Sequence, residues 1–276
     1  MMRLALVTIV HRRHAHLRRQ RAWIEAMEPQ PLLHVVVSMD DDEIRSVVAE
    51  TDACPTVVTQ LDTGGELPLS AARNLGVRVA EEHGAQNVAL LDVDCLPGPD
   101  LARDYTEAIQ EAADEESPAV VCGRVYYLPS GLVEADYTLA RLRRAGEDHP
   151  VRTVPEPGDL VEGDPRLLWS LNVAMSLTDW HRIGGFDERY VGYGGEDTDF
   201  GQRLKAAGGT MYWSAGAEAF HQYHPISDPP VEHAVAIARN ANLFHSNWGF
   251  YPMEGWLAQL QREGHLMLGP AGWREA

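Results

Sequence analysis

The stretch NVALLDVD, residues 87 to 94, is an apolar run that ends in two aspartates one residue apart. A continuous apolar run is typical of a parallel strand that helices cover on both faces. Ligands of such sheets bind beyond the carboxyl ends of the strands, where Asp92 and Asp94 fall. Two carboxylates that point the same way repel each other unless a cation, such as Mg²⁺ or Mn²⁺, lies beside them. Alternatively, the pair caps the turn at Pro97 or the helix that follows it.

Four more apolar runs in the first half of the chain predict strands, at residues 4–10, 32–38, 55–61 and 119–128. Between residues 70 and 83, Ala72, Leu75 and Val79 recur on one face of an amphipathic helix. A further helix is expected to start near Pro99. The alternation predicts an α/β fold with a Rossmann-like, mostly parallel sheet flanked by helices.

The composition limits the partners and the compartment. The formal charge of −18 argues against nucleic acid or an anionic membrane as a partner, because both require clustered Lys and Arg. Three cysteines without paired spacing support neither a disulfide framework nor a zinc site. The apolar run at residues 4–10 is too short to span a bilayer, and its charges follow it rather than precede it. No integral membrane segment is therefore expected, and a cytoplasmic protein is the simplest interpretation.

A second acidic cluster stands in YVGYGGEDTDFGQRL, residues 190 to 204, just before a helical pattern. A helix N-terminus stabilises carboxylates as anions, which suits a functional role for Glu196 and Asp197, although acids are also ordinary helix caps. Asp199 lies four residues before Arg203, so a plain ion pair is expected there. The glycines of the stretch let a backbone come close to a ligand.

Two histidines follow a predicted strand at residues 210–220, in the stretch AFHQYHP. An imidazole ligand beside a carboxylate favours Mn²⁺ over Mg²⁺ as the bound metal. A lone histidine is more often structural or on the surface, and this is the interpretation favoured for His224, His233 and His245.

Taken together, these motifs resemble the metal-dependent GT-A glycosyltransferases, particularly family 2 and its galactosyl- and N-acetylgalactosaminyltransferase relatives. The resemblance rests on VTIVHRRHAHL, LPLSAARNLGVRVA, the D-x-D stretch and IGGFDERYVGYGGEDTDFGQRLKAAGG. It covers nearly the whole chain outside residues 130–165. It implies a GT-A fold with a C-terminal helical cap, a nucleotide-sugar donor, a carbohydrate acceptor and Mn²⁺ or Mg²⁺ as the cofactor.

The resemblance also assigns roles to single residues. Asp197 matches the general base of inverting relatives, and Asp94 and His221 match the metal ligands. The donor-binding positions are Thr8, Asp40, Arg73, Asp92 and Asp94. The acceptor-binding positions are Trp169, Asn172, Tyr193, Gly195 and Glu196. Plainer interpretations stay open at three of these positions: a solvated helix arginine for Arg73, a helix cap for Asp40 and core packing for Trp169.

Four parts of the chain are expected on this basis: a nucleotide-sugar-binding half (1–128), a loop-rich insertion or lid (129–166), an acceptor-binding and catalytic half (167–228) and C-terminal helices (229–276). The implied function is metal-dependent transfer of a hexose from a UDP-hexose, UDP-galactose among them, or from GDP-mannose to a saccharide or glycoside hydroxyl, with inversion. The alternatives are a retaining mannosyltransferase of intracellular polysaccharide synthesis and a sugar nucleotidyltransferase. A homo-oligomer is compatible with the sequence.

Overall fold

The computed structural model describes residues 3–225 and 227–276. Its large sheet has the strand order β3-β2-β1-β4-β9-β6-β10-β5, with β7 paired to β6 and β8 paired to β10. The strands are β1 Leu4–Val10, β2 Leu33–Met39, β3 Thr56–Leu61, β4 Asn87–Leu91, β5 Cys95–Pro97, β6 Ala119–Tyr127, β7 Glu147–Asp148, β8 Leu160–Gly163, β9 Asn172–Ser176 and β10 Thr210–His221, and a separate hairpin pairs β11 Leu266–Gly269 with β12 Gly272–Glu275.

Nine α-helices lie in the described part of the chain: α1 His14–Glu25, α2 Ile44–Val48, α3 Leu69–Glu82, α4 Leu101–Ala112, α5 Leu139–Ala145, α6 Leu177–Ile183, α7 Glu196–Ala206, α8 Ala234–Trp248 and α9 Glu254–Arg262. Short 3₁₀ turns are η1 Glu134–Asp136, η2 Pro165–Leu167 and η3 Val231–His233. Apolar side chains of α3, α6 and α7 pack on one face of the sheet, and those of α1, α2 and α4 on the other. None of the helices among these residues is long and apolar enough to cross a membrane.

The predicted α/β fold with a mostly parallel sheet is confirmed, and each strand predicted from an apolar run is present within a few residues. β3, β2, β1 and β4 are parallel neighbours, and β10 is parallel to β6. The sheet is mixed because β9 runs antiparallel between β4 and β6. This strand was not predicted. The segment 129–166 contributes α5 and the short strands β7 and β8 to the fold.

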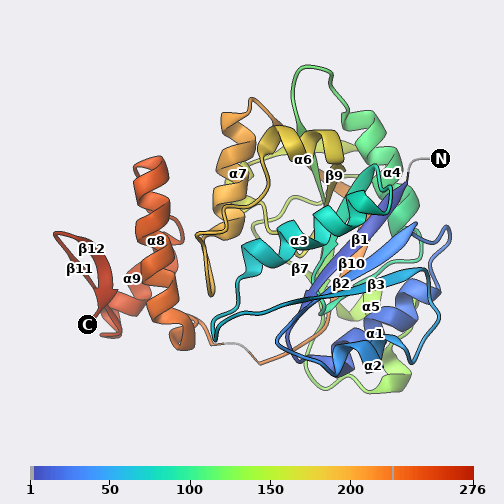
Figure 1. Cartoon of the computed structure of the whole chain (residues 1–276), viewed down its shortest axis with the longest axis horizontal. Coiled ribbons are helices and arrows are strands. Elements are labelled where there is room, and N and C mark those ends of the chain that lie inside the picture. The colour runs from blue at the N-terminus through green and yellow to red at the C-terminus, as the bar shows by residue number, and fades with distance from the viewer. Residues whose placement is uncertain (1–2, 226) are drawn as a thin grey trace.

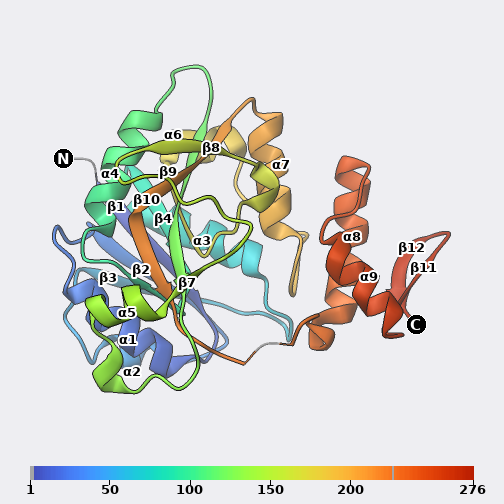
Figure 2. The ribbon, with the colours of Figure 1, turned by 180° about the vertical axis from the view of Figure 1, so that it is seen from behind.

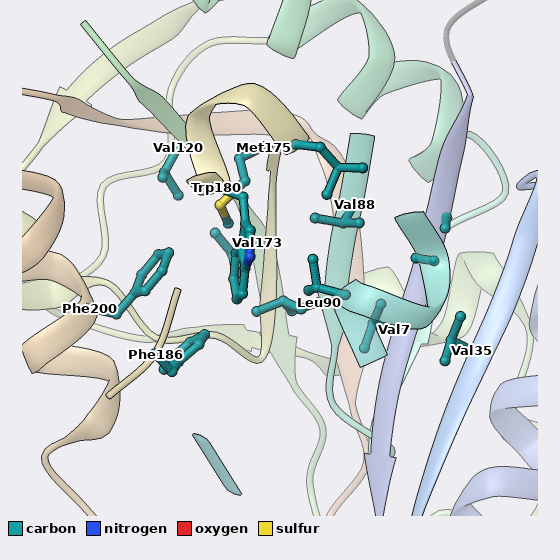
Figure 3. Close-up of a cluster of buried hydrophobic side chains, with 14 of the residues drawn as sticks. Val7, Val35, Val88, Leu90, Val120, Val173, Met175, Trp180, Phe186 and Phe200 are labelled. Carbon is teal, nitrogen blue, oxygen red and sulfur yellow. The ribbon is translucent and has the colours of Figure 1, made fainter. Parts of the chain in front are cut away.

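The largest apolar cluster fills the space between the sheet and the helices α3, α6 and α7, as Figure 3 shows for Val7, Leu90, Trp180, Phe186 and Phe200. Gly76 allows α3 to lie directly on β1, since a Cβ at this position would come 2.3 Å from Val7 Cγ1. The close contact fixes α3, and with it Arg73, relative to the ends of the central strands.

The C-terminal unit, residues 231–276, forms a lobe of its own. Figures 1 and 2 show α8, α9 and the β11–β12 hairpin beside α7 and away from the sheet. The lobe has its own apolar cluster, centred on Ile237, Ala241, Leu257 and Leu260. The hairpin was not predicted from the sequence.

Candidate active site

A single buried guanidinium lies among three carboxylates where β4 ends and α7 begins. Arg73, which is 5% exposed, places Nη2 3.5 Å from Asp92 Oδ1, Nη1 3.5 Å from Glu196 Oε1 and Nη1 3.9 Å from Asp197 Oδ1. Burial opposes its charge, but the carboxylates of Asp197, Asp92 and Glu196 outweigh burial and raise the pKa of Arg73. Three acids on one cation leave an excess of negative charge, which protons or a bound cation can offset.

Two of these acids hold protons unusually well. Burial, followed by the charge of Asp197, raises the pKa of Glu196 to about 7 against the pull of Arg73. Burial also raises the pKa of Asp92 to about 6, with Arg73 opposing and Asp94 reinforcing the shift. Near neutral pH the cluster is therefore partly protonated, which limits the repulsion around Asp197.

Glu196→Gln is expected to change how stability depends on pH. A carboxyl whose pKa is raised on folding contributes stability below its unfolded pKa of about 4.5 and loses it as pH rises through about 7. Glutamine is neutral at every pH. Relative to the native chain, the free energy of unfolding of the variant should therefore increase over this pH range, by up to about 3 kcal/mol. Urea denaturation in EDTA at pH 4.5 and pH 8 measures the gain, and parallel stability–pH curves would contradict it.

Asp197 is held in place by Ser170. The Ser170 backbone N–H donates to Asp197 Oδ2 at 3.0 Å, and the Ser170 hydroxyl donates to Oδ1 at 2.6 Å. Ser170 is fully buried, whereas the Asp197 side chain keeps 21% of its surface exposed. The carboxylate is thus oriented from behind and open in front, as a general base requires. Nothing in the sequence pointed to Ser170, because its partner lies 27 residues away.

A second cluster brings together Asp94, His221 and His224, whose ligand atoms lie within 4.8 Å of one another. Asp94 Oδ1 is 3.6 Å from His221 Nε2, and Asp94 Oδ2 is 3.2 Å from His224 Nε2. The Gln222 N–H donates to the Asp94 carbonyl at 2.7 Å, which ties the end of β10 to the turn after β4. His224, for which the sequence favoured a structural or surface role, therefore lies with the two predicted metal ligands.

The chemistry of this cluster fits a divalent metal. Asp94 Oδ1 is buried and has no hydrogen-bond donor within the described residues. Burial lowers the pKa of His221, which favours the neutral imidazole that binds metals. One carboxylate with two imidazoles suits Mn²⁺ better than Mg²⁺.

The two aspartates of the opening stretch serve different clusters. β4 ends at Leu91, and the Cys95 N–H donates to the Asp92 carbonyl at 2.8 Å, which closes a turn over Val93 and Asp94. Asp92 lies beside Arg73, whereas Asp94 lies beside the two histidines. Each carboxylate thereby gains its own cationic or metal-binding neighbour.

Thr8 and Asn172 are fully buried, and their polar atoms bond to other groups of the core. The Thr8 hydroxyl donates to the Leu91 carbonyl at 2.9 Å and lies 3.0 Å from His34 Nε2. Asn172 donates to the Ala217 carbonyl at 2.8 Å and accepts from the Tyr105 hydroxyl at 2.7 Å, which ties β9 to its neighbours. These bonds argue against the donor contact predicted for Thr8 and the acceptor contact predicted for Asn172.

The other predicted contact residues lie nearer the surface. Asp40 is exposed at the end of β2, where it has φ +48° and accepts from the Thr63 N–H at 3.1 Å. Trp169 is half-buried, with His149 edge-on to its ring at 4.8 Å. Tyr193 is 39% exposed, and Gly195 begins α7 with φ +93°.

The ion pair expected between Asp199 and Arg203 does not form. Asp199 is 1% exposed, and its Oδ1 accepts from the Trp248 indole at 2.7 Å and from the Tyr190 hydroxyl at 3.1 Å. Arg203 instead donates to the Gly184 carbonyl at 3.0 Å. The i,i+4 spacing could not reveal that Asp199 faces α8.

Comparison with known proteins shows what the chain is similar to. Residues 165–225 match a family described as the N-terminal domain of galactosyltransferase. The chain is 33% identical over 244 residues to validoxylamine A glucosyltransferase of Streptomyces hygroscopicus subsp. limoneus, covering 79% of this chain and 52% of that protein. It is 28% identical over 227 residues to chondroitin synthase of Escherichia coli, covering 72% of this chain and 32% of that protein. The chain thus spans about half the length, or less, of these curated relatives.

Solved structures share the fold. S. aureus TarS 1–349 in complex with UDP-GlcNAc superposes with a TM-score of 0.60 at 13% identity, over 95% of this chain and 77% of that one. GalNAc-T7 with UDP, GalNAc and Mn²⁺ gives 0.59 at 13% identity, over 95% of this chain and 57% of that one. With this fold, the matched segment and these relatives, the chain is similar to the GT-A-fold, family 2-like glycosyltransferases and carries a galactosyltransferase-type segment.

Proposed function

We propose that the protein transfers a hexose from a nucleoside-diphosphate sugar to a hydroxyl of a saccharide or glycoside, with inversion at the anomeric carbon. One observation carries the proposal: Asp197, a carboxylate oriented by Ser170, lies in the Arg73 cluster, next to the Asp94–His221–His224 group. The two are linked through Asp92, whose pKa responds to the charges of both Asp94 and Asp197. A base and a metal-binding group side by side are what a displacement at a sugar diphosphate needs.

Asp197 would act as the general base. As the acceptor oxygen forms its bond to the anomeric carbon, its proton passes to Asp197, and the bond from that carbon to the diphosphate breaks with its electron pair on the diphosphate. Asp197 lies in the first turn of α7, where the helix N-terminus carries a partial positive charge. Glu196, with a pKa of about 7, adds little negative charge beside it at neutral pH.

Asp94, His221 and His224 would hold the metal, and bound Mn²⁺ would supply Lewis-acid stabilisation of the departing diphosphate. The Mn²⁺ in the GalNAc-T7 structure supports this choice of ion. Uridine is the favoured base of the donor, because UDP and UDP-GlcNAc occupy the two structural neighbours. Asp40, exposed at the end of β2, remains our candidate for contact with the base or ribose.

Calorimetry tests the donor and metal assignments directly. UDP, GDP and their hexose conjugates would be titrated into the protein with Mn²⁺ or with EDTA. We expect metal-dependent binding of uridine nucleotides, weakened about tenfold or more in His224→Ala by loss of a metal ligand. His245→Ala, which removes an exposed imidazole from α8, is the matched control. No binding of any nucleotide would overturn the proposed function, whereas unchanged affinity in His224→Ala would remove only that ligand.

A further inference from the structure

The loop before α7, residues 191–195, is held by a residue of the C-terminal unit. Asn240 of α8 is fully buried, and its Nδ2 donates to the carbonyls of Gly194 at 2.8 Å and Val191 at 3.1 Å. The neighbouring Arg239 also donates to the Val191 carbonyl and pairs with Glu66. Buried amide bonds of this kind fix a loop that has no regular secondary structure of its own.

The close packing of the loop against the C-terminal unit requires glycines at two positions. Gly192 and Gly194 have φ values of +74° and +93°, and a Cβ at either position would lie 2.9 Å from Ala236 Cβ or Met253 Sδ, respectively. The sequence predicts that these glycines let the backbone come close to a ligand. They instead let it approach α8 and the start of α9, so the loop is shaped by the C-terminal unit.

The C-terminal unit also reaches α7 itself. The Trp248 indole of α8 donates to the buried Asp199, two residues after Asp197. The first turn of α7 is therefore fixed from two sides: Ser170 holds Asp197 from the sheet, and α8 holds the preceding loop and Asp199. A shift of about 1 Å in a catalytic group can cost about 10²-fold in rate, so this support bears on catalysis.

Aromatic rings of the C-terminal unit gather beside the same loop. The ring of Tyr193 stacks on His233 at 4.8 Å and on Trp256 at 5.9 Å, both near parallel. Tyr193 stands three residues before Glu196, the first residue of α7, so this stack lies next to the start of that helix. Burial and the charges of Glu196 and Asp197 raise the pKa of Tyr193 to about 12. Aromatic faces suit the C–H faces of sugar or cyclitol rings.

We infer that the C-terminal unit forms one side of the acceptor site. Asn240 is a positioning residue that fixes residues 191–195 and thereby the orientation of Asp197. His233 and Trp256 extend Tyr193 into an aromatic wall for the ring of a saccharide or cyclitol acceptor. The inference rests on the proposed function, and the residues it adds, Asn240, His233 and Trp256, lie outside the matched segment 165–225.

Asn240→Ala and Asn242→Ala form a matched pair that tests the positioning role. Asn242 lies in the same helix, and its side-chain bonds among the described residues stay within the C-terminal unit: it donates to the Trp273 carbonyl at 2.7 Å and accepts from the Trp273 N–H at 2.8 Å. Both variants should lower Tm. Asn240→Ala alone should lower kcat about tenfold or more with donor affinity within about twofold. Equal kcat in the two variants, measured well below both Tm values, would overturn the positioning role.

Hydrogen exchange gives a readout that does not depend on activity. The Gly192 amide donates to the Leu67 carbonyl at 2.9 Å, and its exchange should accelerate in Asn240→Ala but not in Asn242→Ala. If the native chain transferred no sugar from any donor, the proposed function would fail, and this exchange would still decide whether Asn240 holds the loop. Equal exchange rates in both variants would overturn the inference on its own.

Trp256→Ala tests the aromatic wall. We expect the acceptor KM to rise about tenfold, with donor affinity unchanged within about twofold, because a tenfold change corresponds to about 1.4 kcal/mol, which is within reach of one stacked ring. Gln261→Ala, an exposed substitution in the same helix, is the control and should leave both quantities unchanged. An unchanged acceptor KM in Trp256→Ala would remove the wall from the acceptor site.

Discussion

We expect Asp197→Asn to lower turnover by about 10²-fold or more while donor affinity stays nearly the same. The substitution keeps the size of the side chain but removes the oxygen that accepts the proton. Both Ser170 contacts can persist, because the amide oxygen can accept from the Ser170 N–H while the amide N–H donates to the Ser170 hydroxyl oxygen. The substitution therefore removes the base with little change in the orientation of the side chain.

Transfer rates at saturating donor and acceptor, together with calorimetric donor affinity, measure this effect. The exposed Asp52, in the loop between α2 and β3, provides an Asp→Asn control that should behave as the native chain does. A kcat that falls without a change in donor affinity separates loss of the base from loss of the metal cluster, which would weaken the donor as well. Unchanged turnover would exclude Asp197 as the base.

The strands that the sequence did predict are apolar runs, whose signal is local. β9 was missed because Ser170 and Asn172 interrupt the apolar pattern of LLWSLNVAMS, and polar side chains normally mark exposed segments. Both are buried in the fold because their partners come from elsewhere: Asp197 for Ser170, and Tyr105 and Ala217 for Asn172. Such partners cannot be identified before the strands are assembled.

The same limit applies to the candidate site. The sequence singled out the acids Asp92, Asp94 and Asp197, because their motifs are short and local. It could not assign His224 to the metal cluster or Asn240 to the loop before α7, since those placements depend on pairings between distant elements. Asp199 illustrates the converse, because a plausible local partner, Arg203, is displaced by Trp248 from another helix.

Arg73→Met is expected to destabilise the fold by about 3–5 kcal/mol at pH 8, because it leaves buried carboxylates without their cation. Arg73 is the shared neighbour of Asp92, Glu196 and Asp197, and its charge lowers the pKa of both Asp92 and Glu196. Without it, the pKa values of these two acids should rise further. Arg78→Met, at an exposed position of the same helix, is the matched control.

The destabilisation should depend on pH in a direction that a packing defect would not produce. Groups with raised pKa values lose stability as pH rises through those values, so the gap between Arg73→Met and the native chain should be small at pH 5 and widen towards pH 8. Adding Glu196→Gln to Arg73→Met should restore part of the loss at pH 8, since the neutral amide needs no cation. Urea denaturation of the native chain, Arg73→Met, Glu196→Gln and the double variant at both pH values measures these differences in the free energy of unfolding. A loss that is equal at pH 5 and pH 8, and that Glu196→Gln does not relieve, would mean that Arg73 stabilises the fold by packing against Phe186 and not by neutralising the carboxylates.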